Sequence, residues 1–387
     1  MEKRFDRIID RRNTNSYKWD VKENELPMFV ADMDFEVAPS ITKTLSERIS
    51  HPIFGYSTMP DSWYESYHFF FKERYGWEIE KDNLLFSLGI IPTISTSVRA
   101  FTDEGDEIIV FTPVYHVFFH SIENNKRKVV KSPLKHENGH YSIDWVDFEN
   151  KISSPKCKML ILCNPHNPCG RIWNKDELER IGNLCKKHNL LVISDEVHGP
   201  ITRPGKEYVP FASVNGTNKE ISIIALAPTK AWNIAGIQTS AAYAYNKEIR
   251  NKLEFALNAD EVMEGNVFSY SIPKACFIDG IEWLDEMREY VYSNIETVKK
   301  YIEENIPSLS VSEIDATYLM WIDISKISKN DEDFCSFMRE TTGLYVSKGS
   351  TFGEEGKGFF RLNVACPRSV LLDGLNRLKK AVDNYKE

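Results

Sequence analysis

Short apolar runs alternate with longer amphipathic stretches between residue 84 and about residue 245. The apolar runs are LLFS (84–87), EIIVF (107–111), MLILC (159–163), LLVIS (190–194) and ISIIAL (221–226). Segments with helical spacing lie between them, such as IPTISTSVRAF (91–101) and KDELERIGNLCKKHN (175–189). Because strands that alternate with helices are joined by parallel crossovers, the pattern predicts an α/β fold with a large, doubly wound, mostly parallel sheet.

The pattern changes from about residue 280. One long amphipathic helix is predicted over residues 283–306, strands over 318–324 and 359–364, and a closing helix over 369–385. These elements predict a smaller α+β domain. The first 45 residues contain few periodic segments and are expected to pack against it. We therefore expect a large domain at 46–280 and a small domain made of 1–45 and 281–387.

Composition narrows the functional classes. The 387 residues carry a net charge of -9 without a long basic run, which argues against nucleic-acid binding. No apolar stretch approaches the roughly 20 residues of a membrane-spanning helix, and the charged N-terminus does not resemble a signal peptide. The seven cysteines form no C-x-x-C pair, so free thiols are expected rather than disulfides or a zinc site. A cytoplasmic protein is the expectation.

Two other motifs are expected to be structural rather than to form a binding site. His116 and His120 have the spacing of metal ligands on one helical face, but no third ligand accompanies them, so no metal site is predicted. The aromatic run SWYESYHFFFKERYGW (62–77) has helical spacing and predicts a core or dimer-contact helix rather than a nucleic-acid surface.

Chemically distinctive residues directly follow the five apolar runs. They are Gly89 to Pro92, Thr112 to Tyr115, Asn164 to Gly170, Asp195 to His198, and Lys230. In an open parallel sheet the ligand crevice lies outside the carboxyl ends of the strands. These segments should therefore meet at one site.

Residue type suggests what each could do there. Lys230 follows an apolar strand among small residues, so its amine should be partly desolvated and easier to deprotonate than a free lysine with a pKa of ~10.4. Asp195 would need a cationic partner if it is buried in its ionised form. Gly89 begins a helix whose free N–H groups could hold an anion such as phosphate.

Structural alternatives remain open for each of these residues. Lys230 could be an ion-paired or snorkelling lysine, and Asp195 a helix cap or half of an internal ion pair. Asn167 could fix an amide at the sheet edge or be an ordinary turn residue. Tyr115 could offer its ring face to an aromatic ligand or belong to the core.

The full set resembles the fold-type I pyridoxal-phosphate enzymes, the aminotransferase class I/II superfamily, over essentially the whole chain. The resemblance implies that pyridoxal 5'-phosphate is the cofactor and that Lys230 forms a Schiff base with it. Asp195 is implied to hold the pyridinium N–H and to keep the ring an electron sink. Asn167 and His198 are implied to lie near the ring's 3-oxygen, and Tyr115 to stack on the ring.

The same resemblance assigns the anion sites. The backbone of Gly89, Ile90 and Ile91 is implied to bind the phosphate. Arg361, within FFRLNVACPR, matches the arginine that holds the substrate's α-carboxylate, for which a bidentate guanidinium is well suited. From residue type alone, Arg361 would be less often functional than structural.

Several segments resemble a subgroup, the cystathionine β-lyases and cysteine C–S lyases. They are FDRIIDRRNTNSYKWD (5–20), FVADMDF (29–35), FGYSTMP (54–60), DEVH (195–198) and APTKAWNIAGIQ (227–238). In that subgroup the tyrosine of the FGY motif, Tyr56 here, reaches the phosphate of the neighbouring subunit's cofactor. A homodimer with shared active sites is therefore implied. FVADMDF is expected to line the substrate entrance.

Departures from the wider superfamily point toward the same subgroup. Many aminotransferases carry a serine and an arginine as phosphate ligands where this chain has Ala227 and Gln238, and a tyrosine where it has His198. The phosphate must then rely on backbone donors, Thr229 and Tyr56. Cofactor affinity is expected to be modest, and unusually tight retention of the cofactor would contradict this expectation.

The subgroup implies β-elimination on L-cystathionine or related L-cysteine S-conjugates, giving pyruvate, ammonia and a thiol such as homocysteine. Lys230 would remove the α-proton. An aminotransferase acting between an L-amino acid and a 2-oxo acid would share every step up to the carbanion, so residue chemistry alone does not separate the two. A regulatory protein that acts by binding a partner is a further alternative, which the intact Lys230, Asp195 and Arg361 disfavour.

Overall fold

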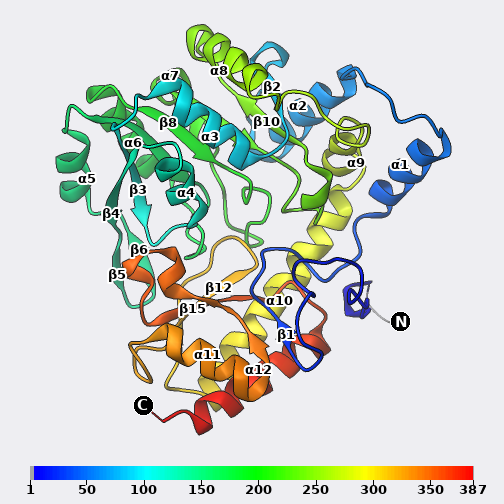
Figure 1. Cartoon of the computed structure of the whole chain (residues 1–387), viewed down its shortest axis with the longest axis vertical. Helices are drawn as coiled ribbons and strands as arrows, with labels where there is room; N and C mark the ends of the chain where they lie inside the picture. Colours follow the sequence, from blue (N-terminus) through cyan, green and yellow to red (C-terminus); the bar gives the residue numbers. More distant parts are fainter. Residues whose placement is uncertain (1–3, 387) are drawn as a thin grey trace.

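A seven-stranded sheet forms the upper half of the molecule in Figure 1. The computed structural model describes residues 4–386. In spatial order the strands are β2 (Leu84–Ser87), β10 (Ser240–Tyr243), β9 (Ser222–Leu226), β8 (Leu191–Asp195), β7 (Cys157–Cys163), β3 (Glu107–Thr112) and β4 (Lys128–Pro133). Only β10 runs antiparallel to its neighbours in this sheet of the described chain. The other six strands therefore end at one common edge.

Both faces of this sheet are covered, which is why most of its strands are continuous apolar runs. Side chains alternate along β3, so Ile108 and Val110 pack into one cluster and Ile109 and Phe111 into another. The first cluster includes α3 (Ile90–Phe101), α4 (Val117–Glu123) and α8 (Lys247–Ala259). The second includes α2 (Asp61–Tyr75), α5 (Trp145–Ile152), α6 (Lys175–Lys187) and α9 (Ile272–Phe277).

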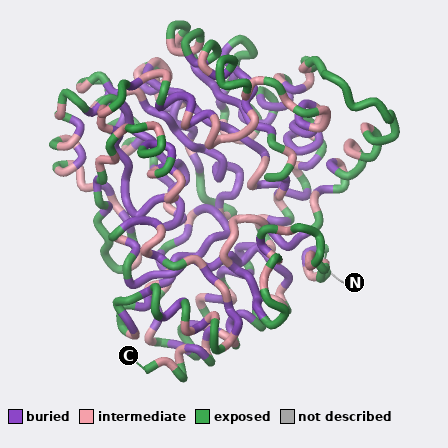
Figure 2. Tube along the Cα trace, in the orientation of Figure 1, coloured by how far each residue is buried: buried purple, intermediate pink, exposed green. Residues whose placement is uncertain are grey.

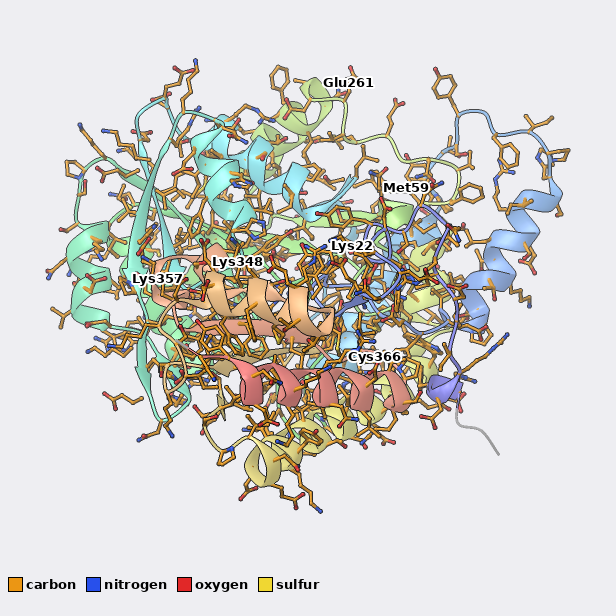
Figure 3. The ribbon with its side chains drawn as sticks, turned by 60° about the horizontal axis from the view of Figure 1, so that its bottom comes forward. Lys22, Met59, Glu261, Lys348, Lys357 and Cys366 are labelled. Atoms are coloured by element: carbon orange, nitrogen blue, oxygen red, sulfur yellow. The ribbon has the colours of Figure 1, made fainter. Side chains whose placement is uncertain are left out.

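A smaller antiparallel sheet lies below the first in Figure 1. Its order is β11 (Ser310–Val311), β12 (Leu319–Asp323), β15 (Phe359–Asn363) and β14 (Ser347–Lys348). Three helices accompany it: α10 (Ile281–Asn305), α11 (Asp331–Thr342) and α12 (Arg368–Asn384). The last two run side by side in Figure 3. Residues from the start of the chain join this region, because β1 (Leu26–Pro27) pairs in parallel with β13 (Leu344–Tyr345).

The predicted fold class is confirmed, and all five apolar runs form strands of the large sheet. A tight turn at Asn138 and Gly139, with φ values of 52° and 83°, joins β5 (Lys135–Glu137) and β6 (His140–Ser142) into a hairpin. The aromatic run at 62–77 forms α2, with Trp63 and Phe70 buried in the core. The pattern missed β4, β10 and α4, because β4 is a half-exposed edge strand and β10 consists mainly of small residues.

One segment leaves the body of the molecule between α1 (Pro39–Ser50) and α2. Every residue from His51 to Thr58 is exposed, as the green loop at the right of Figure 2 shows. Ile53 is 66% exposed, Phe54 55% and Tyr56 102%. Apolar and aromatic side chains gathered on one exposed segment are typical of a surface that a partner covers.

All seven cysteines are buried and free, in agreement with the prediction of free thiols. Within residues 4–386, no helix has the length and apolar character needed to pass through a membrane.

Candidate active site

The five polar segments converge at the carboxyl edge of the large sheet, as the strand order requires. Parallel pairing of β3, β7, β8 and β9 brings the residues after these strands to one side. β2 shares their direction, so Gly89 begins α3 at the same edge. Four of the segments are linked by interactions of their side chains: Lys230 with Asp195 and His198, Tyr115 with Asp195, and Asn164 with Glu196.

Lys230 lies in the turn after β9, with its amine directed at the N-terminal segment of the chain. Its Nζ donates a hydrogen bond of 2.7 Å to the carbonyl oxygen of Ala31. Burial lowers the pKa of this amine to about 8, and the positive charge of Arg361 contributes, while Asp32 and Asp195 oppose the shift. A substantial fraction of the lysine is therefore neutral near physiological pH, which a nucleophilic or basic amine requires.

Asp195, the last residue of β8, is buried. The amide of Val197 donates a hydrogen bond of 3.2 Å to its Oδ1. Burial raises the pKa of the carboxyl group to about 6, an effect that this hydrogen bond and the amine of Lys230 partly offset. A cationic ligand group placed against Asp195 would restore its ionised form.

Arg361 projects from β15 of the small sheet toward the same edge. Its Nη1 donates a hydrogen bond of 3.0 Å to Oδ1 of Asn167, and its Nη2 donates one of 2.9 Å to the carbonyl of Phe29. The guanidinium carbon lies 4.7 Å from the centroid of the Phe352 ring. Burial lowers the pKa of Arg361 to about 10. The guanidinium is thus held in place by neutral groups. Its positive charge is therefore available to pair with an anionic ligand.

His198 completes the group beneath Lys230. Burial lowers its pKa to about 3, with the charges of Lys230 and Arg361 contributing, so the imidazole is neutral. Within the described chain, His198 Nδ1 and Arg361 Nε are buried without a hydrogen-bond partner. Because buried polar atoms are normally paired, these two atoms indicate positions where a ligand would supply hydrogen bonds.

The remaining predicted residues surround this group. Gly89 is the N-cap of α3, and the first amides of a helix, here those of Ile90 and Ile91, have no partners within the helix. Thr229 precedes Lys230 in the turn and is partly exposed. Tyr115 is also partly exposed, and burial raises its pKa, with Arg361 and Asp195 close enough to influence it.

Tyr56 stands apart from these residues, because it belongs to the exposed segment 51–58.

Sequence reasoning missed several residues that hold the site together. Asn233, Tyr318 and Asn363 donate hydrogen bonds to carbonyls of residues 30–35. The only available signal was the unusual segment FVADMDF, which marked residues 29–35 without identifying their partners. Their side chains come from positions 198 or more residues away.

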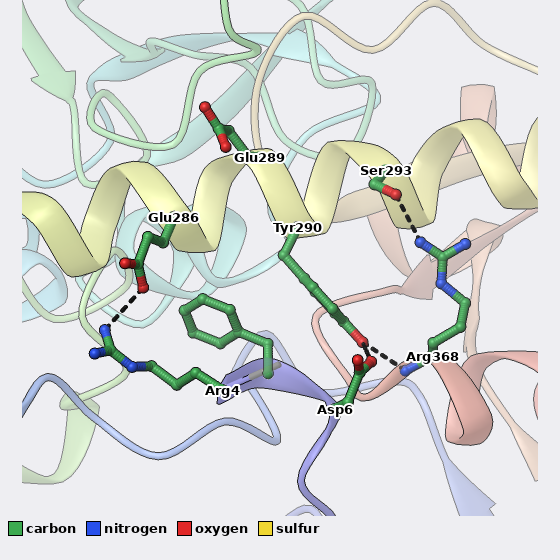
Figure 4. Close-up of a pocket in the computed structure, with 8 residues that line it drawn as sticks. Arg4, Asp6, Glu286, Glu289, Tyr290, Ser293 and Arg368 are labelled. Carbon is green, nitrogen blue, oxygen red and sulfur yellow. Dashed lines mark hydrogen bonds and ion pairs between the residues drawn. The ribbon is translucent and has the colours of Figure 1, made fainter. Parts of the chain in front are cut away.

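A cavity of about 750 Å³ lies elsewhere, between the N-terminal residues and α10. Several of its polar side chains pair with one another. Figure 4 shows Arg4 bonded to Glu286, and Tyr290 bonded to Asp6 and to the amide of Arg368. The cavity lacks the combination of a lysine with a lowered pKa and a buried carboxyl group that marks the sheet edge.

Comparison with known proteins agrees with this geometry. A family model for aminotransferase class I and II matches residues 24–378. The chain is 36% identical over 385 residues to cystathionine beta-lyase PatB of Bacillus subtilis (strain 168), covering 98% of this chain and 99% of that protein.

Two solved structures share the fold over their whole length. Cystalysin from Treponema denticola, which contains pyridoxal 5'-phosphate, has a TM-score of 0.96 and 32% identity, covering 100% of both chains. A pyridoxal-phosphate-bound C–S lyase from Staphylococcus hominis has a TM-score of 0.93 and 31% identity, covering 99% of this chain and 98% of that one. With a family model that spans most of its length and relatives that align end to end, the chain belongs to the aminotransferase class I and II family.

Proposed function

We propose that this protein is a pyridoxal-phosphate-dependent carbon–sulfur lyase. Its reaction would be β-elimination on L-cystathionine or a related L-cysteine S-conjugate. The observation that carries the proposal is Lys230, a buried amine hydrogen-bonded to Ala31 whose pKa is lowered to about 8 by burial and which lies near the buried carboxyl group of Asp195 and the buried guanidinium of Arg361. Relatives named cystathionine beta-lyase and C–S lyase support this reaction rather than amino transfer.

The charges of the site fit pyridoxal phosphate. The protonated ring nitrogen would pair with Asp195, whose raised pKa reflects a buried carboxyl group that needs a cation. The phosphate would lie at the start of α3, against the amides of Gly89, Ile90 and Ile91, with Thr229 beside it. The buried, unpaired Nδ1 of His198 suits a hydrogen bond to a polar ligand atom.

Two further residues would fix the ring. Asn167 would donate from its amide to the ring's 3-oxygen, because its own carbonyl oxygen already accepts from Arg361. Tyr115 would stack its partly exposed ring on the cofactor.

When bound, pyridoxal phosphate supplies an electron sink that makes the α-proton of an amino-acid substrate removable. Arg361 would hold the substrate's α-carboxylate through its free guanidinium protons. Lys230, neutral above its pKa of about 8, would accept the α-proton. Loss of the thiolate from the β-carbon and hydrolysis then give pyruvate and ammonia.

The deciding experiment supplies the cofactor-loaded protein with L-cystathionine and no 2-oxo acid. A lyase releases pyruvate and thiol in equal amounts over many turnovers. An aminotransferase stops after one turnover, with the cofactor in its amine form. Lys230→Ala should abolish turnover, and full activity in that variant would overturn the assignment. Protein that binds no cofactor at all would favour a regulatory role.

We further propose a homodimer in which Tyr56 reaches the phosphate in the neighbouring subunit. The exposed segment 51–58 with Ile53, Phe54 and Tyr56 supports a surface that a second copy covers. Mixing Tyr56→Phe with Lys230→Ala tests the proposal. Each variant alone should be impaired, whereas mixed dimers contain one site with both native residues and should regain activity. Failure of the mixture to regain activity would contradict a shared site.

We propose the cytoplasm as the location, because all seven cysteines are free and thiols stay reduced there. Fractionation of the producing cell would test it.

We also propose residues 46–280 as the large domain, and 1–45 with 281–387 as the small one. In support, each sheet is built within one of these ranges. Limited proteolysis should cut first near the boundaries.

A further inference from the structure

Residues 29–35 form an irregular segment whose carbonyl groups are held by side chains from three distant parts of the chain. Phe29 accepts from Arg361 and Ser347, Val30 from Asn363, Ala31 from Lys230 and Tyr318, Asp32 from Asn363 and Lys18, and Met33 from Asn233 and Arg11. Backbone without regular structure is fixed only when its polar groups find such partners. The segment therefore occupies a defined position directly beside Lys230.

The carboxylate of Asp32 is fixed as firmly as the backbone. Arg11 contacts both of its oxygens, with Nη2 at 2.8 Å from Oδ2 and Nη1 at 3.2 Å from Oδ1. The buried amine of Lys18 lies 3.6 Å from the same group. Arg11 and Lys18 are in turn held by Asp34, which is itself buried. Asp32 is thus an ordered negative charge, next in the chain to the carbonyl that Lys230 contacts.

Four other charged or titratable residues face the Lys230 amine. Arg361 repels its charge, Asp195 attracts it, and His198 and Tyr318 are neutral. In the proposed reaction the cofactor ring would neutralise Asp195 and the substrate carboxylate would neutralise Arg361. Among the protein's own groups named in this balance, Asp32 would then be the negative charge that still acts on the lysine while the proton moves.

We propose that Asp32 is a positioning residue that stabilises the protonated amine of Lys230, and that Arg11 limits the strength of this effect. The physical basis is the attraction of a fixed carboxylate for a nearby ammonium, weakened by a guanidinium that shares the carboxylate. Such a balance would set the pH at which Lys230 can accept the α-proton. Its catalytic consequence rests on the proposed function, whereas the electrostatic effect itself does not.

The test measures the protonation of Lys230 directly in the full-length, cofactor-free protein. The rate at which acetic anhydride labels Lys230 is followed against pH by mass spectrometry of its peptide, because only the neutral amine reacts. Asp32→Asn should lower the midpoint by about 0.5–1 pH unit, and Arg11→Gln should raise it. Glu36→Gln is the matched control, since Glu36 is an exposed carboxylate near the same segment that pairs with Arg7. It should leave the midpoint unchanged.

Opposite shifts separate an electrostatic role from a structural one. If Asp32→Asn and Arg11→Gln moved the midpoint in the same direction, loosening of the segment would explain both, and the proposal would be wrong. The proposal would also be wrong if the labelling midpoint of Asp32→Asn equalled that of Glu36→Gln.

Activity provides the second readout. In the cofactor-loaded protein, the rising limb of kcat against pH should move in the same direction as the labelling midpoint, because kcat reports groups of the substrate complex, in which the Lys230 amine is free. If the protein has lyase activity but the Lys230 labelling midpoints do not move, the proposed role of Asp32 is wrong and the proposed function stands. If the labelling midpoints move but the protein has no lyase activity, the electrostatic effect of Asp32 is confirmed and the proposed function is wrong.

Discussion

The ionisable residues at the sheet edge are each driven toward the neutral form by burial. The pKa of Asp195 rises to about 6, whereas the pKa of Lys230 falls to about 8 and that of Arg361 to about 10. A cationic ligand group would stabilise the ionised form of Asp195, and an anionic ligand group would stabilise the charged form of Arg361. The site is therefore complementary to a ligand assembly that is cationic at one end and anionic at the other, as a protonated pyridine ring and an amino-acid carboxylate are.

Asp195→Asn should separate stability from function. In the cofactor-free protein, the amide removes the cost of a buried carboxylate, so thermal stability at neutral pH should be unchanged or higher. Cofactor binding should weaken and kcat should fall by roughly 100-fold or more, because the ring would lose its charged partner. Calorimetry and steady-state kinetics measure the two effects. Asp176→Asn, an exposed position on α6, is the control and should change neither.

Glu196, beside Asp195, should make stability depend on pH. Its buried carboxyl group accepts hydrogen bonds from Ser194, Asn164, Tyr208 and the amide of Phe211, yet burial raises its pKa to about 7. For an acid with a raised pKa, the cost of ionisation appears as pH rises from the unfolded value of ~4.3 and is complete above the folded value.

Glu196→Gln removes this cost and can keep the hydrogen bonds, because the hydroxyl group of Tyr208 can reverse its role and accept one. The difference in Tm between variant and wild type should therefore increase from about pH 5 to about pH 8. Thermal melts across this range measure it. A constant difference would show that the pKa of Glu196 is not raised.

At the scale of elements, the packing of α6 depends on one small residue. Gly182 faces the buried side chain of Asn218 in α7 (Gly216–Glu220), and a Cβ atom on Gly182 would come within 2.6 Å of Asn218 Cγ. Asn218 cannot move freely, because its Nδ2 donates to the carbonyl of Leu178. The two helices thus approach closely only because residue 182 has no side chain.

Gly182→Ala tests which of two opposing effects is larger. Helix propensity alone would stabilise α6 by about 1 kcal/mol. We expect the clash with Asn218 to outweigh this gain and to destabilise the protein by about 1–3 kcal/mol. Urea unfolding measures the change. Gly216→Ala, where nothing lies within 4 Å, is the control and should not be destabilising. A stabilised Gly182→Ala protein would contradict this account.

Helices and strands were predictable from the sequence where the local pattern of apolar and polar residues matches their burial in the fold. The strands β7, β8 and β9 are mostly apolar and almost entirely buried because both faces of the sheet are covered, and α6 has a capping box of Asn174 and Glu177 at its start. In contrast, β4 is an edge strand with only one buried residue, and β10 gains its place through pairing with β2 and β9 rather than through its own composition. Tertiary pairing of this kind leaves little trace in a single sequence.

For the whole molecule, cofactor binding should raise stability by mass action. At a concentration 100-fold above Kd, a ligand that binds only the folded state contributes about 2.7 kcal/mol. Pyridoxal phosphate should therefore raise Tm in a concentration-dependent way. Pyridoxal without the phosphate should raise it less at equal concentration, because the amides at the start of α3 would lose their anion. Equal shifts for both compounds would contradict the placement of the phosphate.

The candidate site was predictable to the extent that strand ends carry it. Lys230, Asp195 and Asn167 directly follow apolar runs, and parallel pairing brings such positions together. The contacts of residues 29–35 were not predictable in the same way. Their partners, such as Tyr318 and Asn363, lie about 290–330 residues away, and no local pattern links them.

The pairing of β1 with β13 has a consequence for the order in which the protein is made. Leu26 leaves the ribosome more than 300 residues before its partner Leu344, and Arg361 and Asn363 follow later still. All strands of the large sheet have been synthesised once the chain reaches residue 243. The nascent chain can thus form the large-sheet part of the site early, but residues 29–35 can take their final place only after Asn363 has been synthesised. The surroundings of Lys230 are in this way completed long after Lys230 itself has been made.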